Sequence, residues 1–581
     1  MRISRRTRTP RGDTMSTHPS SAMRCNGPTP ARPTLLTVAV AASLLSPAAW
    51  AFEIDTGNPD LTLRWDNTLR YNHAVRVEQR DSKIGNSALA DEGDYRFDKG
   101  DAVAKRLDIL SELDLVYARA HGLRISAAGW YDGAYDGRSR TNPNPPFTNI
   151  PSYVGQQYSS TTQRLYRGGT GEILDAFVFS QANLGEVPVR AKLGRHTVYW
   201  GESLLLGGNL HGVAYAQNPL DLQKAFATPG AEAKELFRPL NQLSMQAQVS
   251  DTLSLAAQYM LEWESFRYPE GGTYLGPVDF VFNGPDRQCA AACATATPIF
   301  ATRGNAAEPK QRGEFGLSAR WSPEWLDGTA GLYYRRFADK LPQTLITQGG
   351  ASPRYNLIYA DGIDLLGLSL AKSIAGVSVG AELSMRHNTP LNSQVLGPAI
   401  GLPEPGETRG PRGDTLHAVL NGLGTINKTP VFDAATWAAE LVWSQYTQVR
   451  SGANLFNALG HTPCNGRDKW DGCVTRNYVG IGMGFTPTWY QVAPGIDLSM
   501  PLNYAVGLKG NAATVFGGNE GLGNYSVGLG ADVHQKYRID LKYIDYIGRY
   551  RDNGTAVTST NGLTTYLKDR GFVSLTLKTS F

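Results

Sequence analysis

The sequence predicts an all-β protein, a single antiparallel up-and-down transmembrane β-barrel of about 18 strands. Three observations predict this fold: apolar side chains recur at every second position, strand connections alternate between short and long, and an amphipathic strand ends in Phe581. A soluble chain of 581 residues would be expected to form several domains, whereas a barrel buries its outer face in lipid and can remain one unit.

The composition agrees with a barrel. The chain has 63 Gly, 27 Tyr and 11 Trp, and its mean hydropathy of −0.30 excludes a bundle of transmembrane helices. Residues 1–51 hold seven of the 56 basic and one of the 52 acidic residues, which leaves 49 basic and 51 acidic groups in residues 52–581. This near balance gives no electrostatic reason to propose nucleic acid as a partner.

Residues 1–51 have the features of a secretory signal peptide. Arginines precede the apolar run 35–45, and small residues lead up to Ala51, so we expect cleavage between Ala51 and Phe52. The apolar run is too short to span a bilayer, which requires about 20 residues. Arg5-Arg6 leaves a twin-arginine signal as an alternative.

The period of the sequence after residue 52 is two, as in strands with one apolar face. In 479–485 four apolar side chains alternate with three glycines, and in 107–118 Asp108, Glu112 and Asp114 oppose an apolar set. The expected strands are 60–77, 107–119, 122–136, 171–185, 187–201, 238–250, 253–264, 313–324, 328–339, 363–374, 377–389, 415–428, 431–449, 477–492, 496–510, 521–534, 536–550 and 571–581.

Connection lengths give these strands a direction. Tight turns such as 120–122 and 185–186 follow the even-numbered strands, and nearly all connections after odd-numbered strands are long. Short periplasmic turns and long outer loops are typical of bacterial barrels, so both termini are expected in the periplasm. Sixteen strands is the alternative count.

The last strand is a further indication of an outer-membrane barrel. Residues 573, 575 and 577 are apolar and Phe581 is aromatic, which resembles the assembly signal that the outer-membrane barrel assembly machinery reads. Thr579 stands where an aromatic residue is commoner. We therefore expect Phe581 to belong to an assembly signal.

Four of the five cysteines follow the export segment and form two local pairs. In an oxidising compartment, Cys289 with Cys293 and Cys464 with Cys473 are expected to be disulfides that clip loops. A zinc site is the alternative, but only His461 lies near either pair at a spacing that suits a ligand.

The connection 202–237 is expected to be helical and to fold into the lumen as a plug or constriction. Asn218 can cap a helix opened by Pro219, and a second short helix can begin at Thr228-Pro229. A loop that lies on the surface is the alternative. The candidate lumen and gate residues are Glu202, Asn218, Asp221, Lys224, Glu232, Lys234, Glu235 and Arg238.

The acidic run 91–101 lacks the spacing of an EF-hand. It is expected to be a solvated outer loop, or one whose carboxylates pair with Arg96 and Lys99, and surface calcium bridging to lipopolysaccharide stays open. His121 with Ser126 and His417 with Asn421 are partial catalytic sets without a nucleophile motif. We therefore expect no enzyme, and assign no catalytic, cofactor-binding or metal-binding residue.

Aromatic residues gather near the expected strand ends, where they suit girdles at the two membrane interfaces. Alternatively, they line a stacking path for an apolar substrate. They include Trp65, Trp130, Tyr131, Tyr199, Trp200, Trp263, Trp321, Trp325, Trp443, Trp489 and Tyr490.

Several longer stretches of the sequence carry a family resemblance. They are FEIDTGNPDLTLRWDNTLRYN from Phe52, GDYRFDKGD (93–101), RLDILSELDLVY (106–117), RISAAGWYDGAYD (124–136), GRHTVYWGES (194–203), NPLDLQKAFATPGAEAKELFRPLNQLSMQ (218–246), LHAVLNGLG (416–424) and the terminal strand. These stretches resemble one family of uncharacterised Gram-negative proteins, the DUF1302 family. The resemblance implies an outer-membrane barrel, often encoded beside a periplasmic DUF1329-type protein and an RND-type exporter, in settings of hydrophobic-compound or lipid metabolism.

These features together predict a protein of the Gram-negative outer membrane. A barrel of 18 strands must conduct water or be plugged, so we expect a channel or transport protein for small solutes, with 202–237 as its gate. The resemblance suggests hydrophobic or lipid-like compounds, with a periplasmic carrier and an RND exporter as partners besides outer-membrane lipid and lipopolysaccharide. A general polar-solute porin and a non-conducting docking or structural protein are the alternatives, and no cofactor is expected.

Overall fold

The computed structural model describes residues 52–144, 151–229, 231, 233–291, 297–348 and 353–581. The expected signal peptide with Ala51, and also Cys293 and Glu232, lie outside these residues. No helix in the described ranges is both long and apolar enough to cross a membrane.

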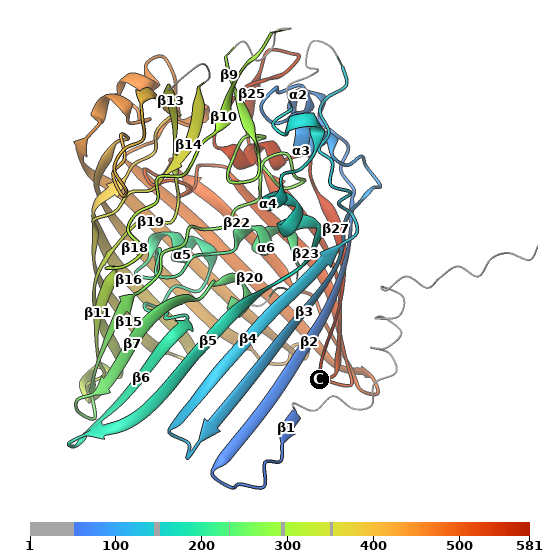
Figure 1. Ribbon diagram of the computed structural model, residues 1–581. Coiled ribbons are helices and arrows are strands. Elements are labelled where there is room, and N and C mark those ends of the chain that lie inside the picture. The colour runs from blue at the N-terminus through green and yellow to red at the C-terminus, as the bar shows by residue number, and fades with distance from the viewer. Residues whose placement is uncertain (1–51, 145–150, 230, 232, 292–296, 349–352) are drawn as a thin grey trace, which may run out of the picture. The chain divides into compact units, whose positions relative to one another are not determined.

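The chain forms a closed antiparallel barrel of 18 strands, as the sequence predicts (Figure 1). The barrel strands are β2 (Leu61–Arg76), β3 (Ala102–Tyr117), β4 (His121–Asp132), β5 (Gly168–Leu184), β6 (Val187–His196), β7 (Leu240–Gln248), β8 (Leu253–Met260), β11 (Phe315–Trp321), β12 (Gly328–Phe337), β15 (Ile363–Ile374), β16 (Val377–Pro390), β18 (Arg412–Ile426), β19 (Ala434–Ser451), β20 (Asn477–Ala493), β21 (Ile496–Ser499) with β22 (Leu502–Lys509), β23 (Gly523–Val533), β24 (Tyr537–Ile547) and β27 (Phe572–Ser580). The last strand pairs with the first, Tyr71 opposite Leu577, and this pairing closes the sheet.

Within the barrel sheet, the number of strand segments differs from the prediction at two places, and the outer loops add further strands that were not predicted. Pro501 separates β21 from β22, and proline has no N–H group to donate to the neighbouring strand, so one predicted strand becomes two collinear pieces. A further strand, β1 (Phe52–Ile54), pairs with β2 and has no counterpart in the prediction.

The long connections lie at one rim, the upper rim in Figure 1, and the tight turns lie at the other. Five outer-loop strands form a second sheet in the order β17-β13-β14-β10-β9. The outer-loop elements are α2 (Ser82–Gly85), α3 (Asp91–Tyr95), η1 (Val154–Gln156), α4 (Ser160–Thr162), η2 (Gln163–Arg167), β9 (Arg287–Ala291), β10 (Ile299–Arg303), β13 (Gln343–Gln348), β14 (Arg354–Ile358), β17 (Leu396–Ile400), η4 (Ala453–Leu455), η5 (Thr462–Cys464), η6 (Lys469–Asp471), β25 (Tyr550–Asp552), β26 (Val557–Thr560) and η7 (Leu563–Leu567), and η3 (Glu324–Leu326) lies in a tight turn.

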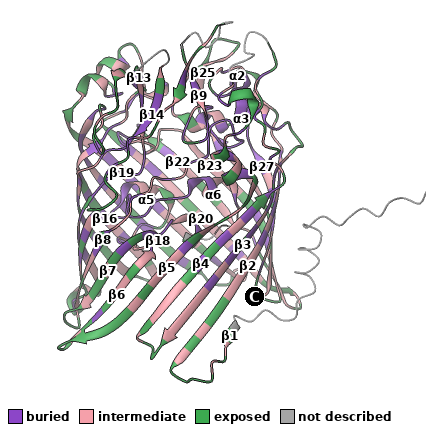
Figure 2. Cartoon of the chain, in the orientation of Figure 1, coloured by how far each residue is buried: buried purple, intermediate pink, exposed green. Residues whose placement is uncertain are grey.

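Apolar side chains cover the outer face of the barrel and polar ones line its lumen. Exposed residues alternate with buried or half-buried ones along strands such as β15 and β16, and Figure 2 shows bands of different exposure along the strands. On β16, for example, Leu383 and Met385 are 45% and 43% exposed, whereas their neighbours Glu382, Ser384 and Arg386 are buried. An apolar outer face around a polar lumen is the arrangement of outer-membrane barrels.

Leu383→Arg is therefore expected to destabilise the barrel by about 2–4 kcal/mol, because it places a cation on the lipid face near the middle of a strand. Urea unfolding of the barrel in lipid vesicles would measure this change in the free energy of unfolding. The heat-modifiable band on gels would report the folded fraction at each urea concentration. Val431→Arg, in a tight turn where the side chain is exposed, should change little. Equal losses for the two variants would contradict the assignment of the lipid face.

The acidic run 91–101 differs from the prediction. Asp91, Glu92 and Asp94 are buried, and Asp94 lies 2.7 Å from the Arg76 guanidinium, so the solvated loop is wrong for these residues. The reason is that the loop packs into the barrel mouth, where Asp91 accepts the Asn142 N–H. The predicted pairing with Arg96 and Lys99 is also wrong, because Arg96 pairs with Asp136.

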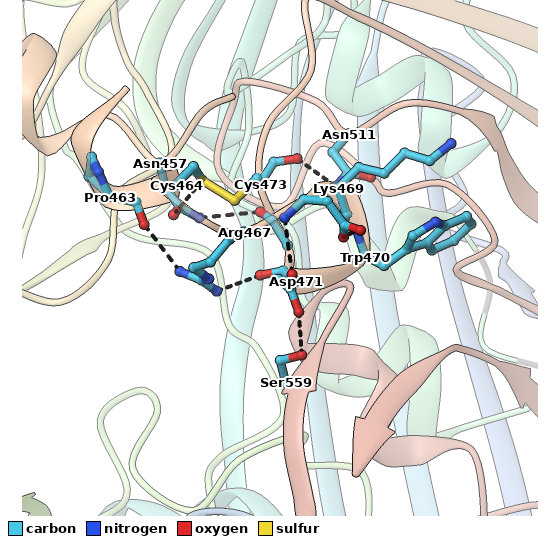
Figure 3. Close-up of a disulfide and its surroundings, with 12 residues drawn as sticks. Asn457, Pro463, Cys464, Arg467, Lys469, Trp470, Asp471, Cys473, Asn511 and Ser559 are labelled. Carbon is cyan, nitrogen blue, oxygen red and sulfur yellow. Dashed lines mark hydrogen bonds between the residues drawn. A yellow bond between two sulfur atoms is a disulfide. The ribbon is translucent and has the colours of Figure 1, made fainter. Parts of the chain in front are cut away.

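A disulfide joins Cys464 and Cys473, the pairing that the sequence predicts (Figure 3). Around it, Arg467 donates to the Asp471 carbonyl, and the Asn511 amide donates to the Cys473 carbonyl at 2.8 Å. Cys289 is also in a disulfide, but its predicted partner Cys293 lies outside the described residues.

The Cys464–Cys473 disulfide is expected to hold the 453–474 segment closed. The disulfide joins residues nine apart and lowers the conformational entropy of the open segment, which stabilises the closed segment by about 3 kcal/mol. In Cys473→Ser the segment should therefore open more readily and be cleaved far faster by a protease. Limited proteolysis of the folded barrel would measure this, with an unchanged heat-modifiable band as the control. Equal cleavage of the wild type and the variant would contradict the expectation.

Candidate functional site

The connection between β6 and β7 enters the barrel lumen. It contains the short helices α5 (Leu206–His211), α6 (Leu222–Ala227) and α7 (Ala233–Leu236), and Figure 1 shows α5 and α6 inside the barrel at mid-height. Asp221 is the cap of α6, and its side chain accepts the Lys224 N–H at 2.8 Å. We call residues 202–237 the lumenal segment.

Two carboxylates on the barrel wall hold the first part of the lumenal segment. Glu440 on β19 accepts the backbone N–H groups of Leu204, Leu205 and Gly208 at 2.7–3.2 Å. Glu382 on β16 likewise accepts three backbone N–H groups, those of Glu202, Ser203 and Val213. Backbone donors that would otherwise be unpaired in the lumen thus receive charged acceptors.

Glycine is required where these carboxylates approach the backbone. A Cβ atom at Gly208 would lie 2.4 Å from a Glu440 oxygen, and one at Gly212 would lie 2.4 Å from a Glu382 oxygen. Any larger residue would push the carboxylates away from their donors.

Cationic and neutral groups of the same wall bind the carbonyls of the lumenal segment. Arg386 on β16 donates to the Leu210 carbonyl at 2.8 Å, and Arg335 on β12 donates to the Tyr215 carbonyl at 2.6 Å. The hydroxyl of Tyr215 donates to Asp339, and His211 Nδ1 lies 3.0 Å from Nδ1 of His417 on β18.

The end of the lumenal segment is attached to the opposite wall. Arg70 on β2 donates two hydrogen bonds to Glu235, at 2.7 and 2.9 Å, and both side chains are buried. Lys234 lies 2.5 Å from Glu112 on β3. Since β2 and β3 lie across the barrel from β16 in strand order, the lumenal segment crosses the lumen.

A cavity of about 1020 Å³ lies beside the lumenal segment, against the wall formed by β20 to β24. This wall carries small lumen-facing residues such as Gly480, Gly482 and Ala505. Ile544 and Tyr546 on β24 also line it. The other lining residues are mainly apolar and come from the lumenal segment and the outer loops; they include Leu205, Leu206, Leu210, Phe226, Leu236, Tyr268, Val278, Phe280, Phe282, Leu357, Phe516 and Leu567. The cavity is therefore an apolar space that leads from the outer loops into the barrel.

The described candidate gate residues anchor the lumenal segment and do not line this cavity. Their partners are as follows: Glu202 approaches Arg320 at 3.5 Å, Asn218 bonds the Val198 backbone, Asp221 and Arg267 pair at 3.2 Å, Lys224 lies over Trp130, Lys234 pairs with Glu112, Glu235 with Arg70, and Arg238 with Glu264. The helix that the sequence places at Asn218 begins instead at Leu222, because Leu220 forms a β-bridge with Phe237.

The partial catalytic sets do not assemble. His121 bonds Ser180, at 2.9 Å, and His417 contacts His211 and Thr415, while the Asn421 amide donates to the Glu202 carbonyl. Within the described ranges, no group of three or more His, Cys, Asp and Glu residues is arranged to hold a metal ion.

The aromatic residues near strand ends divide into two groups. Trp65, Trp321 and Tyr490 are exposed on the outside, as girdle residues would be. Trp130, Trp200 and Trp263 are 6%, 8% and 3% exposed, so the girdle assignment is wrong for them. They point inward because the lumenal segment and the outer loops supply an apolar interior for them to pack against.

The anchors Glu382 and Glu440 were missed at the sequence level. Each is a single acidic residue at a lumen-facing position of a strand, which is common in any barrel. The glycines of the lumenal segment, Gly207, Gly208 and Gly212, were the available signal, since close backbone approach requires glycine.

A family model described as a protein of unknown function, DUF1302, matches residues 32–581. A comparison with curated proteins finds no match for this sequence. Among solved structures, OccAB4 of Acinetobacter baumannii is similar at 9% identity and a TM-score of 0.38, over 90% of this chain and 100% of that one. OpdK of Pseudomonas aeruginosa, crystallised with vanillate, is similar at 10% identity and a TM-score of 0.37, over 89% of this chain and 98% of that one.

Proposed function

The chain belongs to the DUF1302 family, and we propose that it is an outer-membrane channel for small apolar or lipid-like solutes, gated by the lumenal segment. The observation that carries the proposal is the attachment of this segment to both walls of the lumen, by Glu382 and Glu440 on one side and Arg70 on the other. A segment held in this way narrows the passage without filling it, since the large cavity remains beside it.

The outer membrane is the proposed location because the closed barrel exposes an apolar band and keeps charged groups inside. Export through a signal peptide cleaved after Ala51, and assembly directed by the strand that ends in Phe581, complete this proposal. A periplasmic DUF1329-type carrier and an RND-type exporter are the partners that the family context suggests.

The apolar solute class is supported by the lining of the cavity. Its lining holds four charged side chains: Glu440, Arg467 and Asp471 are bonded to protein groups, and Lys542 is the one without an ion pair among the described residues. A passage for ions or sugars is expected instead to present free charged or polar groups to its solute. This contrast favours the apolar channel over the general porin.

The test replaces residues 204–236 with a short Gly-Ser linker and measures conductance in planar bilayers. We expect the wild type to conduct weakly and the variant to conduct several-fold more, because a barrel of 18 strands without its constriction is open to water. A linker of the same kind at residues 553–556, the tip of the β25–β26 hairpin, is the control and should change nothing.

The outcomes separate the alternatives. A large conductance that the replacement does not change would contradict the gate and favour a polar-solute porin. No conductance in either protein would contradict the channel and favour a docking role. In cells, faster uptake of the apolar dye N-phenyl-1-naphthylamine by the wild type than by cells lacking the protein would support the solute class.

A further inference from the structure

Three aromatic rings from two outer loops, 261–314 and 510–522, meet at the outer part of the cavity. The ring of Tyr268 stacks on Phe282, with centroids 4.9 Å apart, and on Phe516, with centroids 4.7 Å apart. The interplanar angles are 29° and 28°, so the rings lie nearly parallel. Phe226 of the lumenal segment packs its edge on Tyr268, and all four residues line the cavity.

The backbone is strained at two of these three positions. Phe282 has a φ of +108° and Phe516 a φ of +55°, a region that bulky side chains rarely adopt. Residues held in such conformations cluster at ligand-binding positions, where the strain fixes a side chain in place. Here the strained backbone brings two rings from different loops onto one tyrosine.

Unpaired hydroxyl groups accompany the rings. Tyr268, Tyr478 and Tyr546 all line the cavity and are 5%, 6% and 7% exposed. A buried tyrosine hydroxyl usually has a hydrogen-bond partner. None of these three has one among the described residues, whereas Tyr153, buried outside the cavity, donates to the Gly271 carbonyl at 2.7 Å.

The cavity offers little to an anion near the rings. Lys542 is a cation in the lining and lies on β24, four residues before Tyr546. It is therefore about 13 Å farther from the outer loops than Tyr546, measured along the strand. A ligand at the ring cluster therefore meets aromatic faces and a hydroxyl, and no free charge.

We infer that Tyr268, Phe282 and Phe516 form the outer binding site for the solute, which is a neutral ring compound that carries a hydroxyl or carbonyl group. The rings would stack on its apolar face and the Tyr268 hydroxyl would bond its oxygen, with Tyr546 and Tyr478 as the next hydroxyl groups along the passage. This inference rests on the proposed channel, because it names the solute class for that passage. Contact between Phe226 and Tyr268 connects the site to the lumenal segment.

The test measures binding of four probes to the purified full-length protein in lipid nanodiscs by calorimetry. The probes are 2-naphthol, naphthalene, 2-naphthoate and 1-decanol, so that ring, hydroxyl and charge vary separately. We expect 2-naphthol to bind at least several-fold more tightly than each of the others. Phe516→Ala should weaken the binding of 2-naphthol and naphthalene alike, by about tenfold, since it removes a stacking face.

Tyr268→Phe gives the sharper result. It keeps the ring and removes only the hydroxyl, so it should weaken 2-naphthol about fivefold and leave naphthalene unchanged. Tyr131→Phe, on the lipid face, is the matched control and should change neither. Tighter binding of 2-naphthoate than of 2-naphthol, or equal effects of Tyr268→Phe on 2-naphthol and naphthalene, would overturn the inference.

Conductance of the same preparations distinguishes the failure of this site from the failure of the channel. If replacing residues 204–236 still opens the pore while no probe discriminates as expected, the binding site is wrong and the channel stands. The heat-modifiable band shows that each variant is folded, and Tyr268→Phe keeps the test decisive if Phe516→Ala does not fold.

Discussion

The double variant Glu382→Ala/Glu440→Ala is expected to pass several-fold more ionic current than the wild type at the same voltage. Together these two carboxylates accept six backbone N–H groups of the lumenal segment. A buried donor left without an acceptor costs about 1–3 kcal/mol. Removing both carboxylates leaves six donors without an acceptor and therefore releases the segment from this wall, and single-channel recording would measure the result.

Asp540→Ala is the matched control for this variant. Asp540 is also a buried lumenal carboxylate, but it pairs with Arg538, two residues away on β24, and contacts no residue of the lumenal segment among the described hydrogen bonds. It should leave the current unchanged. Equal currents in the wild type and the double variant would contradict the role of the two anchors.

The outer loops are expected to open more readily at pH 8 than at pH 5. Burial raises the pKa of Glu270 to about 7, against the lowering effect of the Gly284 and Asn283 backbone N–H groups. Because the folded pKa is raised, the associated stability is fully present below about pH 4.5 and is lost as the pH rises through about 7. The loss amounts to about 3 kcal/mol for a carboxyl group that is 3% exposed.

A second carboxyl group in the same loop acts in the same direction. Burial raises the pKa of Asp279 to about 6. The pKa of the neighbouring Asp91 carboxyl group is raised too, by burial and by the charge of Asp279. Asp279 and Asp91, like Glu270, therefore stabilise the closed loops when their carboxyl groups are neutral.

Hydrogen exchange of residues 261–312, corrected for the intrinsic pH dependence, would measure the opening at pH 5 and pH 8. Glu270→Gln should remove much of the difference, since the amide stays neutral at both values. Glu308→Gln changes an exposed carboxylate of the same loop and should leave the difference intact. Identical exchange at the two pH values in the wild type would contradict the expectation.

The strands were predictable and the anchors were not, for a physical reason. Alternation of apolar and polar residues is a local pattern, and every predicted strand range overlaps an observed strand. The anchors act over long separations: Glu440 bonds N–H groups 232–236 residues away, and Glu382 bonds one 169 residues away. A strand pattern shows that such a carboxylate faces the lumen, but not which segment it meets there.

The lumenal segment was predictable in its place and only partly in its detail. Its length and its helix signals indicated an inserted loop, and the structure places it in the lumen. Its candidate charges were expected to face the solute, whereas Glu235 and Lys234 turn to the wall and bind Arg70 and Glu112. Apolar side chains of the same segment, such as Phe226 and Leu236, line the cavity instead. A charged group is costly in a space of low dielectric unless it is paired, so the charged side chains bond to the wall. The apolar face of the lumenal segment is then the one that faces the passage.

The most direct measurement is a disulfide between the lumenal segment and β20, the barrel strand that pairs with β19 beside Glu440. A Cβ atom at Gly482 on β20 would lie 3.9 Å from the Leu205 Cβ, within the range of disulfides. Leu205→Cys/Gly482→Cys should therefore cross-link in isolated outer membranes, and in planar bilayers its current should rise on reduction, whereas that of the wild type should not. Leu205→Cys/Gly484→Cys, with no Leu205 atom within 4 Å of the second position, should not cross-link. Failure of the first pair to cross-link, or cross-linking of both pairs alike, would contradict a lumenal segment held at this wall.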